Sequence, residues 1–134
     1  VDNSKVEDEL FTFAMIETAE ALENLTAIAA TPGLSGLYLG PANLTLSLTG
    51  RTPSAPFNRE THELIPAIAE VLATAHDNGI RAALHCRSAK DAHRAREWGF
   101  DMVIVSEDAR RIDRPAVSVA VIRRDSPIAL ACGV

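Results

Sequence analysis

Short apolar runs alternate with helix-forming stretches along most of the chain, and this alternation limits the folds open to it. Four apolar runs are long enough to be buried strands of a parallel sheet, at about 11–16, 36–40, 80–86 and 102–105. Helices are predicted where apolar residues recur three or four positions apart, at about 18–31, from Asn58 to Asn78 and from Ser88 to Trp98. Strands that alternate with helices form a parallel sheet with right-handed crossovers. We therefore predict an α/β fold.

Two architectures fit this order of elements: an open doubly wound sheet, or part of a (β/α)8 barrel. No Gly-x-Gly-x-x-Gly pattern follows a predicted strand, which weakens the dinucleotide-binding form of the open sheet. A whole barrel needs about 250 residues. With 134 residues and four predicted strands, the chain would be one domain or half of a barrel.

Three parts of the sequence interrupt the alternation. Residues 41–57 are rich in Pro, Gly, Ser, Thr and Asn and are predicted to form a long loop, which in a compact domain is more often functional than idle. Pro66 predicts either a kink in its helix or a later start. Residues 115–134 fall outside the βα series and read as two short strands or an arm for subunit contact. The predicted division is thus 1–114 for the barrel part and 115–134 for the arm.

Composition excludes several classes of protein. The net charge of -5 and the pI near 5.3 argue against a nucleic-acid partner. No apolar run approaches the roughly 18 residues of a membrane span, so no membrane partner is expected, and no signal-peptide pattern is present. Cys86 and Cys132 do not form a paired framework and are predicted to be plain thiols. We predict a cytoplasmic protein.

Glu17 stands where the first predicted strand gives way to a helix. A carboxylate at the end of a buried strand is costly unless its charge is compensated, and in βα folds this end holds ligands and metals. The next strand ends at Gly40, followed by Asn43, and neighbouring strand ends lie about 4.8 Å apart. A carboxylate and an amide oxygen can bind one hard cation, and N–H groups after Gly40 can hold a small carboxylate. The alternative is that Glu17 caps the following helix. Spacing alone does not choose between the two.

Three stretches resemble the second half of the HpcH/HpaI aldolase family, which comprises class II, metal-dependent pyruvate aldolases. They occur in the family's order and spacing, at residues 15–25 (MIETAEALENL), 32–44 (PGLSGLYLGPANL) and 99–110 (GFDMVIVSEDAR). The resemblance extends from about Phe11 to Ile112. It implies a (β/α)8 TIM barrel of which this chain supplies about the last four βα units.

The resemblance also implies roles for particular residues. In the family, a Glu after the fifth strand and an Asp in Gly-Pro-x-Asp-Leu bind a divalent metal, usually magnesium, manganese or cobalt. Glu17 matches the first ligand, whereas Asn43 stands at the Asp position, and the lost charge should weaken a hard-cation site. The N–H groups at Ala42 and Asn43 match those that hold the pyruvate carboxylate. Met15 stands where many relatives have a substrate-contacting Gln, and Met cannot make that polar contact.

The family's catalytic His and its polarising Arg come from early strands, so the resemblance implies that they lie outside this chain. His85, at the end of the third predicted strand, is assigned to the substrate pocket, and a role as catalytic base is the alternative. His62, His76 and His93 have charged neighbours on predicted helices and are expected to face solvent.

The resemblance implies a metal-dependent lyase or aldolase that cleaves or forms a C–C bond in a pyruvate-derived 2-oxo hydroxy acid. Its partners would be a small 2-oxo acid and an aldehyde, and its metal would stabilise the enolate as a Lewis acid. A non-catalytic half-barrel that binds a 2-oxo acid or acts in assembly is the first alternative, which Asn43 and Met15 favour. A citrate-lyase-type acyl lyase is the second. Because a half-barrel exposes strand edges, we expect a homo-oligomer. Because the resemblance implies that the catalytic His lies outside this chain, we expect the isolated chain to be inactive.

Overall fold

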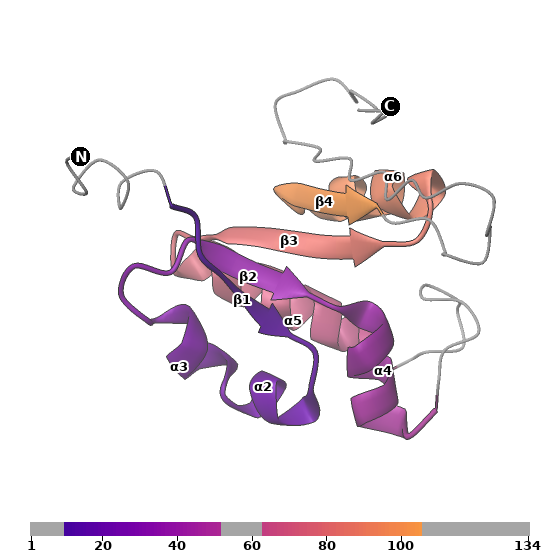
Figure 1. The fold of residues 1–134 in the computed structure, drawn as a ribbon, viewed down its shortest axis with the longest axis horizontal. Coiled ribbons are helices and arrows are strands. Elements are labelled where there is room, and N and C mark those ends of the chain that lie inside the picture. Colours follow the sequence, from indigo (N-terminus) through magenta and orange to yellow (C-terminus); the bar gives the residue numbers. More distant parts are fainter. Residues whose placement is uncertain (1–9, 52–62, 106–134) are drawn as a thin grey trace.

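A single parallel sheet of four strands forms the centre of the fold (Figure 1). The computed structural model of the chain describes residues 10–51 and 63–105. All four predicted strands are present, each within about two residues of its expected ends. They are β1 (Phe13–Ile16), β2 (Gly36–Leu39), β3 (Arg81–Cys86) and β4 (Met102–Val105).

The strand order decides between the two predicted architectures. Each strand pairs with the one before it, in the order β1-β2-β3-β4, whereas a doubly wound sheet reverses its order at a switch point. Right-handed crossovers that advance in one direction place the helices on one face. Accordingly, α5 (Leu64–Asp77) packs on β2 and β3, and α6 (Ala89–Trp98) packs on β3 and β4, both behind the sheet in Figure 1. The described residues therefore form a half-barrel of the (β/α)8 type.

Side chains of the strands alternate between a helix-covered face and an open face. On the covered face the strands contribute fully buried residues to the core, namely Ile16, Leu37, Leu39, Ala82, Leu84, Cys86 and Val103. On the open face, Tyr38 and His85 are half-buried, and Met15 is 51% exposed. In a closed barrel this open face lines the interior.

The helix predicted over 18–31 is divided in two, α2 (Ala19–Glu23) and α3 (Leu25–Ala29). The division falls at Asn24, whose Nδ2 donates to the backbone oxygen of Glu20 at 2.9 Å. An Asn side chain bonded to a nearby carbonyl offers the backbone an alternative to the next helical turn. The break is therefore a local effect of one polar residue.

The helix α5 ends where the sequence predicts, and α6 begins and ends as predicted. Within the described residues α5 begins at Leu64, so Pro66 lies in its first turn, and the prediction of a later start than Asn58 is confirmed. The helix α6 begins after Ser88, whose hydroxyl accepts from the Asp91 N–H at 3.1 Å, and ends at Gly99 with a φ of 105°. No helix in residues 10–51 and 63–105 is long and apolar enough to cross a membrane.

The predicted loop over 41–57 is wrong in its first part, because α4 (Pro41–Thr49) begins directly after β2. Pro41 occupies the first turn, where its missing N–H is harmless, and Gly50 ends the helix with a φ of 68°. The hydroxyls that suggested a loop are satisfied within the helix: Thr45 donates to the Pro41 oxygen at 2.7 Å, and Thr49 to the Thr45 oxygen at 2.8 Å. Residues 52–57 lie outside the described part, as do 106–134 with the predicted arm and Cys132.

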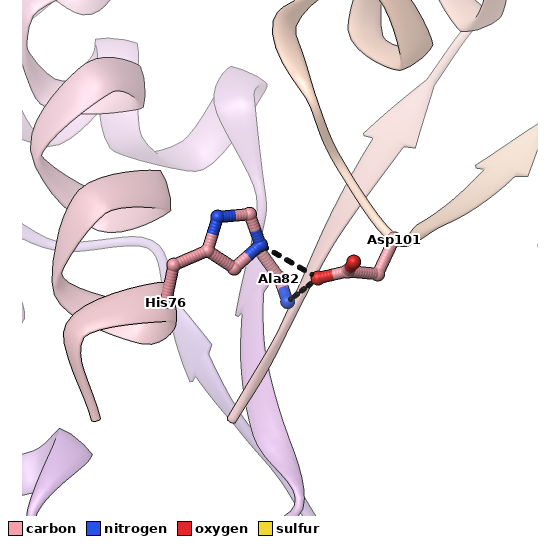
Figure 2. A network of polar contacts seen from close by, with 3 residues as sticks. All are labelled: His76, Ala82 and Asp101. Carbon is pink, nitrogen blue, oxygen red and sulfur yellow. Dashed lines mark hydrogen bonds and ion pairs between the residues drawn. The ribbon is translucent and has the colours of Figure 1, made fainter. Parts of the chain in front are cut away.

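The opposite end of the sheet is held by a polar network around Asp101 (Figure 2). Its Oδ2 accepts from the Ala82 N–H at 2.9 Å and lies 2.8 Å from His76 Nε2. The Asp101 N–H in turn donates to the Ala82 oxygen at 2.9 Å. His76 is on the surface as predicted, but its ring is bound. The network joins the end of α5 to the starts of β3 and β4, far along the strands from Glu17.

Candidate active site

The carboxyl ends of β1 and β2 bring together the two residues that the sequence analysis singled out. Asn43 lies in the first turn of α4, and its Nδ2 donates to Glu17 Oε2 at 2.9 Å. Backbone pairing sets this proximity, because Ile16 pairs with Leu39 and the Gly40 N–H donates to the Ile16 oxygen at 3.1 Å. Glu17 is half-buried and Asn43 exposed, so the pair is open to a ligand from above the strand ends.

Thr18, not Glu17, is the side-chain cap of α2. The Thr18 Oγ1 accepts from the Ala21 N–H at 3.1 Å. The Ala19 N–H donates to Ser47 Oγ at 2.8 Å, which ties the start of α2 to α4. The alternative that Glu17 caps the helix is therefore wrong, and its carboxylate is directed toward the first turn of α4 instead.

The first turn of α4 presents backbone N–H groups beside that carboxylate. Gly40 is the residue before the helix and offers no side chain to cap it, and the first helical bond runs from the Leu44 N–H to the Gly40 oxygen at 3.0 Å. The N–H groups of Ala42 and Asn43 precede this first bond and have no carbonyl of the helix to donate to. They lie at the N-terminus of the helix, the end that attracts anions. This geometry suits a small carboxylate.

Met15 and Gly40 shape the space next to Glu17. A Cβ added at Gly40 would lie 3.4 Å from Glu17 Oε2 and 3.9 Å from Met15 Cε. Met15 thus lies beside the pair on the open face, as predicted, and supplies an apolar contact. These are ordinary van der Waals distances, so a side chain at position 40 would not clash with its neighbours. Because Gly40 has no side chain, the approach to Glu17 over β2 is unobstructed.

His85 lies on the same open face and has a partner that the sequence analysis missed. Tyr38 Oη and His85 Nδ1 are hydrogen-bonded at 2.8 Å, and their rings meet edge-on with centroids 6.3 Å apart. Burial, and secondarily the Arg87 charge, lowers the pKa of His85, which favours the neutral imidazole. Burial, and then Cys86, raises the pKa of Tyr38. Strand alternation, which puts residues 38 and 85 on one face, was the signal available for this pair.

The donor set at Glu17 and Asn43 fits a hard cation with few protein ligands. Within residues 10–51 and 63–105, no cluster of three or more His, Cys, Asp or Glu side chains could hold a metal ion. A half-turn of the Asn43 amide would set its Oδ1 beside the Glu17 carboxylate, since the two ends of an amide have nearly the same shape. Cations such as Mg²⁺ accept one or two protein oxygens and keep several waters. The two side chains therefore suit a hydrated hard cation, but together they carry a single negative charge.

Cys86 is a free thiol buried on the covered face, as predicted. Burial, with a smaller contribution from Asp91, raises its pKa to about 12. Such a thiol is inert as a nucleophile at neutral pH. It belongs to the core and not to the site.

Comparison with known proteins identifies the family of the chain. The sequence matches the HpcH/HpaI aldolase/citrate lyase family over residues 3–115, which is most of the chain. The chain belongs to this family. The prediction made from its three motifs is thereby confirmed.

Named relatives of this HpcH/HpaI chain are aldolases. It is 37% identical over 106 residues to the hydroxypyruvate/pyruvate aldolase of Rhizorhabdus wittichii, a match that covers 79% of this chain and 41% of that protein. It is 33% identical over 93 residues to the 5-keto-4-deoxy-D-glucarate aldolase of Klebsiella pneumoniae, covering 69% of this chain and 34% of that protein. This HpcH/HpaI chain thus spans about two-fifths or less of the length of these curated relatives.

The solved structure of the HpcH/HpaI aldolase from Desulfitobacterium hafniense superposes with a TM-score of 0.70 at 24% identity. The superposition covers 81% of this chain and 40% of that one. At this identity the likeness shows the fold alone. It agrees with a half-barrel.

Proposed function

We propose that this chain is the part of a metal-dependent pyruvate-type aldolase that holds the divalent cation and the 2-oxo acid. The observation that carries the proposal is the Glu17–Asn43 contact of 2.9 Å across the ends of β1 and β2. Its aldolase relatives support a C–C lyase acting on pyruvate or hydroxypyruvate and an aldehyde.

Within this site each residue has a definite task. Glu17 and the Asn43 side-chain oxygen would hold magnesium, manganese or cobalt, and a bound cation supplies Lewis-acid stabilisation of an enolate. The N–H groups of Ala42 and Asn43 bind the acid's carboxylate at the N-terminus of α4. Met15 packs against the carbon chain, and His85 supplies a polar group further along the open face. The groups that move protons are assigned to the other half of the barrel.

A non-catalytic half-barrel that binds a 2-oxo acid is the second candidate. The specific observation in its favour is that Asn43 donates to Glu17, so that the pair is satisfied without a cation. The family name also covers citrate lyases, and a citrate-lyase-type acyl lyase is the third candidate. We further propose a cytoplasmic homo-oligomer, since no strand among the described residues pairs with the outer edge of β1 or of β4.

The test is a titration of the chain with Mn²⁺, followed by pyruvate, with binding of the acid read from paramagnetic broadening of its methyl proton signal. We expect Glu17→Gln to weaken Mn²⁺ binding and to reduce the broadening, because it removes the one charged ligand. The matched control is Glu23→Gln, which neutralises an exposed carboxylate at the far end of α2. Equal broadening in Glu17→Gln and the wild type would reject the site. Release of pyruvate from an aldol substrate by the chain alone would reject the assignment of proton transfer to the other half.

A further inference from the structure

The strand register places a second polar group level with Glu17. Ile16 pairs with Leu39, and Leu39 pairs with Leu84. One residue further along, Glu17, Gly40 and His85 therefore form one row across the carboxyl ends of β1, β2 and β3. With neighbouring strands about 4.8 Å apart, the backbones of Glu17 and His85 are about 10 Å apart.

The middle of this row has no side chain. Gly40 stands between Glu17 and His85, and the atoms nearest to a Cβ built there belong to Glu17 and Met15, at 3.4 to 3.9 Å. The Gly40 φ of -102° is open to any residue, so the backbone does not require glycine here. Its absent side chain instead lets a small molecule bound at Glu17 extend over β2 toward β3.

Tyr38 and His85 are the polar side chains that the strands contribute to this part of the open face. The strand residues around them on this face are apolar: Met15, Ala83, Met102 and Ile104. The bond of 2.8 Å to Tyr38 fixes which edge of the His85 ring faces β2 and which faces away. A bond at Nδ1 also selects the tautomer of a neutral imidazole, and hence the hydrogen-bonding character of Nε2.

We propose that His85, positioned by Tyr38, is the specificity group of this site and hydrogen-bonds the C3 hydroxyl of a 3-hydroxy-2-oxo acid. The inference rests on the proposed function, which places the carboxylate and 2-oxo end of the acid at Glu17 and α4. The far end of the acid then lies over Gly40, toward the His85 ring, while the other strand side chains around that ring are apolar. Tyr38 acts through the imidazole and is a positioning residue.

The test compares hydroxypyruvate with pyruvate, which differ in the C3 hydroxyl alone, by calorimetric titration of the Mn²⁺-loaded chain. One hydrogen bond between neutral groups predicts about three- to tenfold tighter binding of hydroxypyruvate. In His85→Leu the ratio of the two affinities should fall to about one. The control His93→Leu, on the exposed face of α6, should keep the wild-type ratio. His85→Gln retains a hydrogen-bonding side chain and should keep part of the preference.

The positioning role has its own readout. In ¹⁵N NMR spectra of the ligand-free chain, His85 should show one dominant tautomer, and Tyr38→Phe should mix the two and lower the affinity ratio. An unchanged tautomer in Tyr38→Phe would overturn the role of Tyr38. An unchanged ratio in His85→Leu, or in His85→Gln and Tyr38→Phe together if the Leu variant does not fold, would overturn the role of His85. Failure of the wild type to bind either acid would overturn the proposed function as well, a result distinct from loss of the ratio.

Discussion

Replacing Asn43 by Asp should convert a weak cation site into a strong one. In the present structure Asn43 Nδ2 donates to Glu17 Oε2, so a cation must displace this hydrogen bond before it can bind both side chains. In Asn43→Asp the amide donor is gone and a second carboxylate faces Glu17. The cation then relieves a repulsion instead of replacing a bond.

The size of the effect follows from the observed separation. Two unit charges at the 2.9 Å between Nδ2 and Oε2 repel by about 1.4 kcal/mol at the dielectric constant of water and by about 6 kcal/mol at an effective value of 20. Glu17 is only half-buried and both carboxylates can turn apart, so the lower figure is the safer one. Since 1.4 kcal/mol is a factor of ten, Asn43→Asp should bind Mn²⁺ at least about tenfold more tightly than the wild type.

Isothermal titration with Mn²⁺ at low ionic strength measures this difference directly. The matched control is Asn24→Asp, because Asn24 is also exposed and its Nδ2 also donates one hydrogen bond, to the Glu20 oxygen at 2.9 Å. The control adds the same charge and loses the same kind of bond away from the site, so its Mn²⁺ affinity should match the wild type. Mn²⁺ affinity in Asn43→Asp no higher than in the control would refute the reasoning.

Three further predictions concern the scaffold. Gly36→Ala should lower the free energy of unfolding by about 1–3 kcal/mol in urea titrations, since the added Cβ would lie 2.6 Å from the Arg81 backbone oxygen. An unchanged unfolding midpoint would contradict this close approach of β2 and β3. Asp101→Ala should lower the free energy of unfolding by about 1–3 kcal/mol, because the network in Figure 2 loses its acceptor. The control Asp77→Ala, at an exposed residue, should lower it by less, and equal losses would speak against the network. Cys86 has a pKa of about 12, so iodoacetamide at pH 8 should alkylate it far more slowly in the native chain than in urea. Peptide mass spectrometry measures the two rates, and equal rates would show that the thiol is not protected.

The parts of the fold that depend on local signals were predictable. The helix α6 was placed correctly because Ser88 and Gly99 mark its two ends. The helix α4 was missed although Pro41 and Gly50 mark its ends in the same way. Its threonines and serine suggested a loop, because composition does not reveal that a hydroxyl will bond the carbonyl four residues back. The break at Asn24 was invisible for the same reason.

The proximity of Glu17 and Asn43 was predictable because strand order alone decides it. The two residues follow adjacent parallel strands, and this order brings their backbones together at one edge of the sheet. The sequence did not decide which residue caps α2, since Glu17 and Thr18 are neighbours and each has a side chain able to accept from the first N–H groups of the helix. The bond between Tyr38 and His85 was missed because it depends on the β2–β3 register, which an apolar pattern does not specify to one residue.

At the proposed cation site, Asn43 would link the affinity for the cation to the stability of the chain. A site of two carboxylates needs its cation, because without it the charges repel across the strand ends. The Asn43–Glu17 bond removes that need, and a bond to a charged group is worth about 1.5–3 kcal/mol, which any cation must overcome. The weak cation binding that we propose and the tolerance of a missing cation would therefore have one cause. Asn43→Asp should reverse both together, so that its melting temperature falls below that of the wild type in chelator and rises with added Mn²⁺. A variant that bound the cation tightly yet melted like the wild type in chelator would separate the two effects and break the argument.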